Sequence, residues 1–358
     1  MAHDRRLCDL FGIELPILLA PMAGVMDPAL AIAVAQAGGL ASLPAAMLTA
    51  EQLRAQVAAF RAGGDKPLNL NFFTHTPPVP NNAREHAWRE RLKPYYVEYG
   101  IDPSAPVPAS NRAPFDAAFC AVVEEVKPAV VSFHFGLPEP ALVARVKAAG
   151  CKVIGSATIV EEARWLEARG CDAVIAQGIE AGGHRGMFLT ADVATQVGTF
   201  ALLPQIVDAV KVPVIAAGAV TDARGIVAAL ALGAAGVQMG TAYLAAPESK
   251  LLPPHRAALK TARDDGTVVT NLMTGRPARG LINRVMREAG PISDLAPDFP
   301  LAGGALAPLH AKAQAQGSGD FSSMWAGQSA ALAREMPAGD LTRALWAEAR
   351  ALMARMAG

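Results

Sequence analysis

Short apolar runs alternate with Ala-rich amphipathic stretches along most of the chain. The runs are bounded by turn residues and are apolar on both faces, which is typical of strands in a parallel sheet covered by helices. The pattern predicts eight strands, at residues 17–20, 40–42, 68–72, 129–133, 152–154, 173–176, 214–216 and 236–239. Helical periodicity predicts helices between them at residues 28–37, 50–62, 140–149, 159–168, 202–210 and 222–232. Eight such α/β units favour a closed (β/α)8 barrel, the TIM-barrel fold, over an open sheet.

Two long segments interrupt this alternation. An insertion at about residues 74–116, rich in Pro, Asn, Tyr and Arg, follows the third strand, and a longer one follows the eighth. We expect residues 1–262 to form the barrel, with 253–262 as its last helix. Residues 263–328 are then a cap or lid on the substrate side, because long loops after barrel strands commonly build the walls of a site. Residues 329–358 return to helical periodicity and are expected to pack back on the barrel.

Composition and charge exclude several classes of function. The 358 residues contain 32 Lys and Arg against 32 Asp and Glu, so a nucleic-acid-binding protein is not expected. The sequence has no uninterrupted apolar run of about 18 residues, so a membrane span is not expected. Asp9, Glu14 and Pro16 interrupt the apolar start, which argues against a secretory signal. The four cysteines are far apart and are expected to be buried, reduced thiols of a cytoplasmic protein: Cys8, Cys120, Cys151 and Cys171.

The chain contains no zinc-protease motif, no nucleophile elbow, no P-loop and no dinucleotide-binding glycine motif after a strand. A barrel of this kind is expected to use an organic cofactor, whose phosphate usually binds after strands seven and eight. Gly218 ends the seventh strand, and Gly240 and Thr241 end the eighth. Glycine lets backbone amides approach a phosphate, and the threonine hydroxyl adds a donor. The alternative is that both glycines only form tight turns.

The segment CDAVIAQGIEAGGHRG carries the most informative candidates. The sixth strand ends at Ala176, so Gln177 and the following loop face the mouth of the barrel. Three glycines flank His184, and we expect a flexible loop that lets its imidazole point into the mouth. With its ordinary pKa near 6.5, such an imidazole accepts or donates a proton at neutral pH. The alternative is an ordinary surface histidine.

Other residues are expected at the same face of the barrel. Asn71 ends the third strand, where its amide can hydrogen-bond a planar heterocycle, and His134 ends the fourth. For either residue the alternative is a hydrogen bond that only tethers a loop. Met22 follows Ala20 and Pro21 at the end of the first strand, where its thioether could lie beside a ring or in the core.

Read in order, several segments resemble the nitronate monooxygenase family, formerly called 2-nitropropane dioxygenases. They are PILLAPMAGV, LNLNFF, VVSFHFG, AQGIEAGGHRG, AAGAV and VQMGT, and the resemblance spans about residues 15–245. AQGIEAGGHRG is the most specific of them, whereas AAGAV and VQMGT are shared more widely among FMN-binding barrels. The resemblance implies an FMN enzyme that oxidises alkyl nitronates, such as propionate 3-nitronate, with O2 and without a metal, to a carbonyl compound and nitrite.

The resemblance also implies roles for residues of this chain. His184 would be the active-site base or a polar substrate ligand, and His134 would line the substrate pocket. Backbone N–H groups near Gly182 would stabilise negative charge on the flavin. The residues implied around FMN are Ala20, Pro21, Met22, Asn71, Gln177, Gly182, Gly183, Gly218, Gln238, Met239, Gly240 and Thr241.

Part of the chain points to a second function. TGRPARGLINR, at residues 274–284, resembles the flavin-dependent enoyl-acyl carrier protein reductases. An NAD(P)H-dependent flavin reductase of quinones or enoyl thioesters is therefore the alternative, and a non-catalytic FMN-binding protein is a third. Some nitronate monooxygenases carry tyrosines and a lysine in the late insertion, and residues 299–310 have neither. Tyr95, Tyr96 and Tyr99 of the early insertion are expected to supply part of that wall instead.

Overall fold

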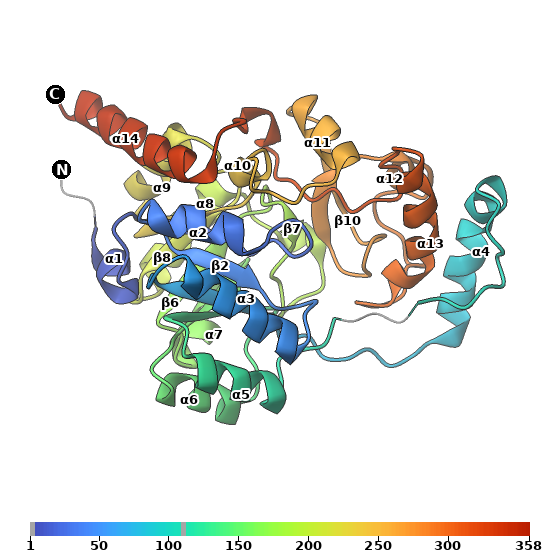
Figure 1. Cartoon of the computed structure of the whole chain (residues 1–358), viewed down its shortest axis with the longest axis horizontal. Helices are drawn as coiled ribbons and strands as arrows, with labels where there is room; N and C mark the ends of the chain where they lie inside the picture. The colour runs from blue at the N-terminus through green and yellow to red at the C-terminus, as the bar shows by residue number, and fades with distance from the viewer. Residues whose placement is uncertain (1–3, 109–111) are drawn as a thin grey trace.

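Eight parallel strands form the central sheet of the computed structural model, which describes residues 4–108 and 112–358 (Figure 1). They are β1 (Ile17–Leu19), β2 (Ala41–Pro44), β3 (Leu68–Phe73), β4 (Val130–His134), β5 (Lys152–Ala157), β6 (Ala173–Gln177), β8 (Val214–Ala217) and β9 (Gly236–Met239). Their order is β1-β9-β8-β6-β5-β4-β3-β2. A parallel bridge between Leu18 and Leu40 joins the two edge strands, with the Leu40 N–H donating to the Ile17 carbonyl at 2.9 Å. The sheet therefore closes, and the predicted (β/α)8 barrel is confirmed.

Helices cover the outside of the barrel. Seven of them follow barrel strands: α2 (Pro28–Gln36), α3 (Ala50–Ala62), α5 (Ala117–Val126), α6 (Pro140–Ala148), α7 (Val160–Ala168), α8 (Thr199–Ala209) and α9 (Ala223–Ala231). Short polar side chains begin four of these helices by accepting hydrogen bonds from first-turn N–H groups: Asp27, Thr49, Asp116 and Asp222. The apolar faces of the helices pack on the outward-facing strand residues in the largest core cluster.

The C-terminal helix α14 (Ala338–Ala357) fills the eighth outer position, between α9 and α2. The prediction that residues 253–262 form the last barrel helix is wrong. They form α11 (Pro253–Lys260), which buries only His255 and Leu259 and packs on the short helix η2 (Ala330–Leu332). The 20 residues of α14 provide a broader apolar face. In the described part of the chain, no helix is long and apolar enough to cross a membrane.

One end of the barrel is closed by the chain's first helix, α1 (Arg6–Phe11). Leu7 and Phe11 of α1 belong to the same buried cluster as the inward-facing strand residues, which include Leu18, Ile175 and Ile215. Burying these side chains stabilises the closed sheet, since each large aliphatic group removed from water contributes about 1.5–3 kcal/mol. The strands' carboxyl ends, at the opposite end, remain available for a site.

The two insertions come together as a cap over that open end. The second insertion contributes β10 (Thr267–Thr270), β11 (Ala278–Leu281), α12 (Arg284–Glu288) and α13 (Ala302–Ala315). The first contributes α4 (Asn82–Glu98), which lies beside α13 (Figure 1). Trp88 of α4 donates its indole N–H to the Ala302 carbonyl at 3.1 Å. We use "the cap" for α4 together with residues 263–328.

The four cysteines are buried and free, as predicted: Cys8, Cys120, Cys151 and Cys171. Burial raises the pKa of the Cys171 thiol to about 12 and that of Cys151 to about 11. Both thiols are therefore protonated at neutral pH and are poor nucleophiles.

Candidate active site

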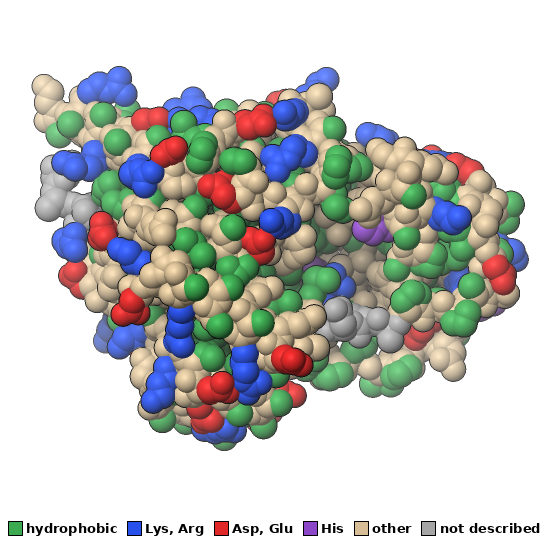
Figure 2. Space-filling view, viewed as in Figure 1, with side chains coloured by type: hydrophobic (Ala, Val, Ile, Leu, Met, Phe, Trp, Pro, Cys, Tyr) green, Lys and Arg blue, Asp and Glu red, His purple; other side chains and the backbone are tan. Residues whose placement is uncertain are grey.

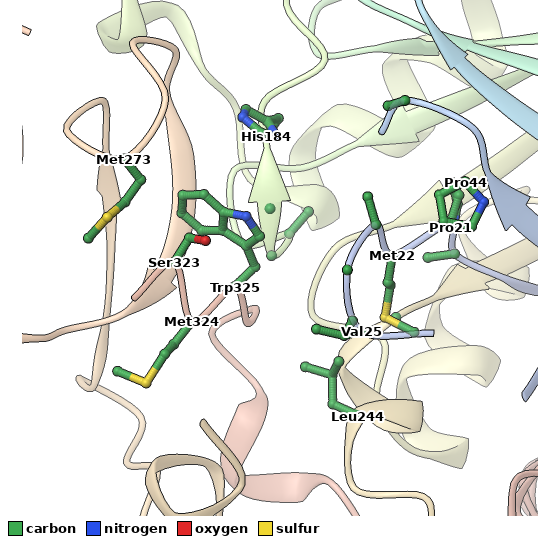
Figure 3. A pocket seen from close by; sticks show the side chains of 18 of the residues that line it. Pro21, Met22, Val25, Pro44, His184, Leu244, Met273, Ser323, Met324 and Trp325 are labelled. Carbon is green, nitrogen blue, oxygen red and sulfur yellow. The ribbon is translucent and has the colours of Figure 1, made fainter. Parts of the chain in front are cut away.

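A cavity of about 570 Å³ lies between the carboxyl ends of the barrel strands and the cap. Figure 2 shows this face of the molecule hollowed between the two parts. In Figure 3, Pro21 and Met22 from the barrel lie across the cavity from Met324 and Trp325 of the cap. Among the described residues that line it there is no Asp or Glu, and Arg112 is the one charged side chain. Such a lining favours an anionic ligand.

All but one of the site residues expected from the sequence line the cavity. Lining it are Ala20, Pro21, Met22, Asn71, His134, Gln177, Gly182, Gly183, His184, Gly218, Gln238, Gly240 and Thr241. Met239 is the exception, because its side chain is buried in the layer between strands and helices. Successive side chains of a strand point to opposite faces, so Gln238 takes the cavity side of β9 and Met239 the helix side.

His184 lies on a short strand, β7 (Gly183–His184), which pairs antiparallel with β11. The expectation of a flexible loop is therefore wrong. The neighbouring glycines serve packing and backbone geometry: a side chain on Gly182 would come within 2.6 Å of the backbone of Ala326, and Gly183 has φ +75°. The strand pairing places the His184 ring at a defined position in the cavity.

The His184 imidazole is enclosed by aromatic rings and held by one hydrogen bond. Its Nε2 lies 2.9 Å from the Thr274 hydroxyl. Four rings surround it at centroid distances of 5.3 to 5.8 Å: Phe73, Phe135, Phe299 and Trp325. Burial, with a smaller effect from the Arg112 charge, lowers the pKa of His184 well below its usual 6.5. His184 is therefore neutral at pH 7, which corrects the expectation of an ordinary pKa, and a neutral imidazole can still accept a proton.

His134 and Gln177 hold the backbone of His184. The His184 carbonyl accepts hydrogen bonds from Gln177 Nε2 at 3.0 Å and from His134 Nε2 at 3.1 Å. Because a carbonyl only accepts, His134 carries its proton on Nε2, and its Nδ1 accepts from the Ser156 hydroxyl at 3.1 Å. Burial lowers the pKa of His134 to about 4. Both ring nitrogens of His134 are thus used in structural hydrogen bonds, as the alternative of a tethering histidine predicts. The residue nevertheless lines the cavity.

The ends of β8 and β9 form a second, more polar corner of the cavity. Gly218 has φ +122° and Ala219 φ +56°, so two successive residues adopt the left-handed region. A side chain on Gly218 would lie 2.7 Å from the Thr199 hydroxyl, so the turn itself requires glycine. Thr241 follows Gly240, and its hydroxyl accepts from the Gly327 N–H at 2.9 Å, which leaves its own hydrogen able to donate to a ligand.

Sequence reasoning missed the parts of this corner that come from the C-terminal segment. Gly327 and Ser329 line the cavity, and the Ser329 hydroxyl lies 2.5 Å from that of Thr221. They carry no motif, and only the folding of residues 327–329 over the barrel brings them there. His255 of α11 and His310 of the cap line the cavity as well, and were also not predicted.

One buried oxygen of the cavity has no partner. Gln238 lines the cavity, and its Oε1 is sealed from solvent without a hydrogen bond to any described residue. An unsatisfied buried acceptor costs about 1–3 kcal/mol, so a ligand that brings an N–H or O–H group to it gains that interaction. The chemistry at this position fits a heterocycle with hydrogen-bond donors along its edge.

Arg185, next to His184, is a structural residue that the sequence did not reveal. It is completely buried, and its guanidinium donates to the carbonyls of Gln177 at 2.6 Å and Gly178 at 2.7 Å. A third bond reaches Gln196 Oε1 at 3.0 Å. Arg185 thus ties the end of β6 to the strand that carries His184.

The three tyrosines at the C-terminal end of α4 do not form the cavity wall, so that expectation is wrong. None of Tyr95, Tyr96 and Tyr99 lines the cavity. Tyr96 donates its hydroxyl to the Ala305 carbonyl at 2.5 Å, and the rings of Tyr95 and Tyr99 pack edge-on against Phe321. They hold α4 to the rest of the cap, because their rings complete its apolar core.

A protein-family model described as nitronate monooxygenase matches residues 4–348. The chain belongs to the nitronate monooxygenase family. Members of this family are flavin-dependent oxidoreductases. A nitronate monooxygenase from Pseudomonas aeruginosa is 46% identical over 349 residues, which are 96% of this chain and 99% of that protein. The family assignment confirms the resemblance found in the sequence.

Two solved structures are similar over nearly the whole chain. A nitroalkane oxidase from Streptomyces ansochromogenes superposes with a TM-score of 0.88 at 39% identity, over 97% of this chain and 99% of its own. FabK from Thermotoga maritima superposes with a TM-score of 0.75 at 30% identity, over 100% and 99%. Both structures thus match this chain over the barrel and the insertions together, and the nitroalkane oxidase is the more similar of the two.

Proposed function

We propose that this protein uses FMN to oxidise alkyl nitronates with O2 to a carbonyl compound and nitrite. The observation that carries the proposal is a neutral, buried His184 in a cavity that has no carboxylate among its described lining residues and one cation, Arg112. A nitronate is an anion, so Arg112 attracts it and no described lining carboxylate repels it. The family and the nitroalkane oxidase from Streptomyces ansochromogenes support the same substrate class.

The residues present fit a flavin mononucleotide. The turn at Gly218 and Ala219, with Gly240 and Thr241, would hold its phosphate through backbone N–H groups and a hydroxyl. Asn71, Gln177, Gly182, Gly183 and Gln238 would border its ring, and the partnerless Gln238 Oε1 would accept from a ring or ribityl donor. When bound, the flavin supplies the electron transfer between substrate and O2.

The chain's own residues would bind the substrate and move one proton. Arg112 holds the nitronate by charge, while the rings around His184 exclude water from the reacting end. When the substrate is a neutral nitroalkane, the neutral His184 imidazole takes the α-proton and leaves the nitronate. When the nitronate is supplied directly, His184 only orients its nitro group.

Nitrite formation tests the proposed function. With propionate 3-nitronate and O2 but no pyridine nucleotide, we expect purified holoenzyme to consume O2 and release nitrite. The rate should exceed NADH oxidation in the presence of a benzoquinone or an enoyl thioester. An oxygen electrode, a colorimetric nitrite assay and absorbance at 340 nm measure the reactions in parallel.

The second candidate is NAD(P)H-dependent reduction of quinones or enoyl thioesters. The likeness to FabK and the TGRPARG segment favour it. Rapid NADH consumption with negligible nitrite would transfer the assignment to this reaction.

The cofactor gives a separate prediction. We expect heat-released cofactor to be FMN rather than FAD, since Gly218, Gly240 and Thr241 form one candidate phosphate site on the cavity and the sequence has no dinucleotide motif. Mass spectrometry of the supernatant identifies the molecule. Release of FAD, or failure to take up FMN on reconstitution, contradicts the prediction.

Removing the Arg112 charge should weaken nitronate binding. Hydrogen bonds to charged groups contribute about 1.5–3 kcal/mol, so Arg112→Gln is expected to raise the KM for propionate 3-nitronate by about 10- to 100-fold. Arg112→Lys keeps the charge and should lose less. Arg224→Gln, which changes an exposed arginine, is the matched control. An unchanged KM in Arg112→Gln would place the anion elsewhere.

A further inference from the structure

The TGRPARG segment, residues 274–280, forms the turn into β11 and reaches His184 twice. The backbones of Ala278 and His184 are register partners in the β11–β7 pair. At the start of the segment, the Thr274 hydroxyl lies 2.9 Å from His184 Nε2. Thr274 itself is 2% exposed, so its hydroxyl exchanges no hydrogen bond with bulk water. The segment thus contacts both the backbone and the ring of His184.

We propose that Thr274 is the positioning residue of His184: it fixes the ring so that Nε2 carries the proton and the Nδ1 lone pair faces the cavity. This inference rests on the proposed function, in which His184 is the base. In this proposal, the TGRPARG segment serves the oxidation of nitro compounds by orienting His184. Binding of a pyridine nucleotide is then not needed to explain the segment.

The direction of the hydrogen bonds supports this tautomer. The Thr274 hydroxyl donates to the Arg276 carbonyl at 3.5 Å, a long contact whose acceptor cannot donate in return. In the proposed arrangement the hydroxyl hydrogen stays on the carbonyl side, so the Thr274 oxygen accepts at 2.9 Å and His184 Nε2–H is the donor. The proton on Nε2 leaves Nδ1 as the unprotonated nitrogen.

The surroundings of the ring indicate where Nδ1 points. His184 lines the cavity, and no described residue forms a hydrogen bond with its Nδ1. Because His184 lines the cavity, we place its Nδ1 on the cavity side of the ring. Gln177 and His134 hold the backbone carbonyl and do not contact the ring nitrogens. Among the described residues, Thr274 is therefore the polar group that orients the imidazole.

Thr274 also supports the protonated state that catalysis creates. When Nδ1 takes the α-proton of a nitroalkane, the C–H electron pair stays on the substrate as the nitronate, and both ring nitrogens of His184 then donate. The Thr274 oxygen accepts from Nε2–H in that state, which matters because aromatic rings enclose the imidazole and the Arg112 charge opposes its protonation. Without this acceptor, the buried imidazolium would be less stable.

Long-range ¹H–¹⁵N correlation NMR of ¹⁵N-histidine-labelled holoenzyme reports the tautomer without any turnover. The His184 signals are those lost in His184→Asn. We expect the wild type and Thr274→Ser to show protonated Nε2, and Thr274→Val and Thr274→Ala to show a shift toward protonated Nδ1 or a mixture. A wild-type ring protonated on Nδ1 overturns the proposal, as does a tautomer unchanged by removal of the hydroxyl.

Kinetics provide the second readout on the same variants. For neutral nitroethane, Thr274→Val should lower kcat by about tenfold, a part of the roughly 10²- to 10⁴-fold that a positioned general base contributes, while Thr274→Ser restores it. For the preformed nitronate the loss should be smaller, because no proton is removed. Equal losses with both substrates, or no rescue by serine, would show a merely structural role. If the wild type turns over no nitro substrate, the proposed function fails. The NMR result then still tests whether Thr274 fixes the tautomer of His184.

Discussion

His184→Asn should retain its flavin and lose about 10²- to 10⁴-fold in turnover of a neutral nitroalkane, the range that a positioned general base contributes. Asparagine preserves a polar side chain on β7 but offers no basic nitrogen. The preformed nitronate needs no deprotonation, so its oxidation should fall much less. Steady-state rates with nitroethane and with its nitronate measure the two effects, and flavin absorbance confirms cofactor retention.

The pH profile follows from the environment of His184. Burial holds its pKa well below 6.5, so the base is fully neutral above that value and becomes protonated only as the pH falls through the lowered pKa. For nitroethane, kcat/KM of the wild type should therefore stay high from neutral pH down through pH 6.5 and decline only well below that value. His184→Asn should lack this decline. His86→Asn changes an exposed histidine on α4 and serves as the control. If His184→Asn loses little turnover, and equally little with nitroethane and with its nitronate, then His184 is not the base.

The barrel and the positions of its strand ends were readable from the sequence for a physical reason. Strands buried on both faces leave continuous apolar runs, and parallel strands must end at the same side of a closed sheet. Asn71, Gln177, Gly218 and Gly240 therefore had to approach one another, whatever the loops between them do. All four line the cavity.

The cap was not readable in the same way, because its contacts join segments without local signals. In α4, polar residues and an internal Pro94 hide the helical pattern, and the helix is stabilised by packing on α13. The ring partner of His184, Thr274, is 90 residues away in the sequence. The flanking glycines indicated flexibility, yet strand pairing with β11 overrides that local tendency.

The electrostatic state of the site also depends on folding alone. An isolated histidine titrates near pH 6.5, but the aromatic rings of the barrel and the cap together remove water from His184. Neither half of the enclosure is complete without the other. The shift in the pKa of His184 is thus a property of the assembled cavity, which no spacing of residues in the sequence encodes.

Arg185→Met is expected to lower the free energy of unfolding by about 3 kcal/mol, because it leaves buried acceptors without their donors and each costs about 1–3 kcal/mol. The acceptors are the carbonyls of Gln177 and Gly178 and the amide oxygen of Gln196. Methionine fills part of the volume and removes a costly buried charge, which limits the loss. Urea unfolding of the holoenzyme, followed by tryptophan fluorescence, measures the change.

Two further variants separate geometry from charge in the Arg185 site. Burial lowers the pKa of Arg185 to about 9, so the side chain is cationic at neutral pH. Arg185→Lys keeps a cation but lacks the planar fork that reaches three acceptors at once, and its stability should lie between those of wild type and Arg185→Met. Arg164→Met removes an exposed arginine and should change stability by no more than about 0.5 kcal/mol. Since Arg185 adjoins His184, Arg185→Met should also slow nitroethane turnover more than nitronate turnover. A stability equal to that of Arg164→Met would show that the three hydrogen bonds do not hold β7 in place.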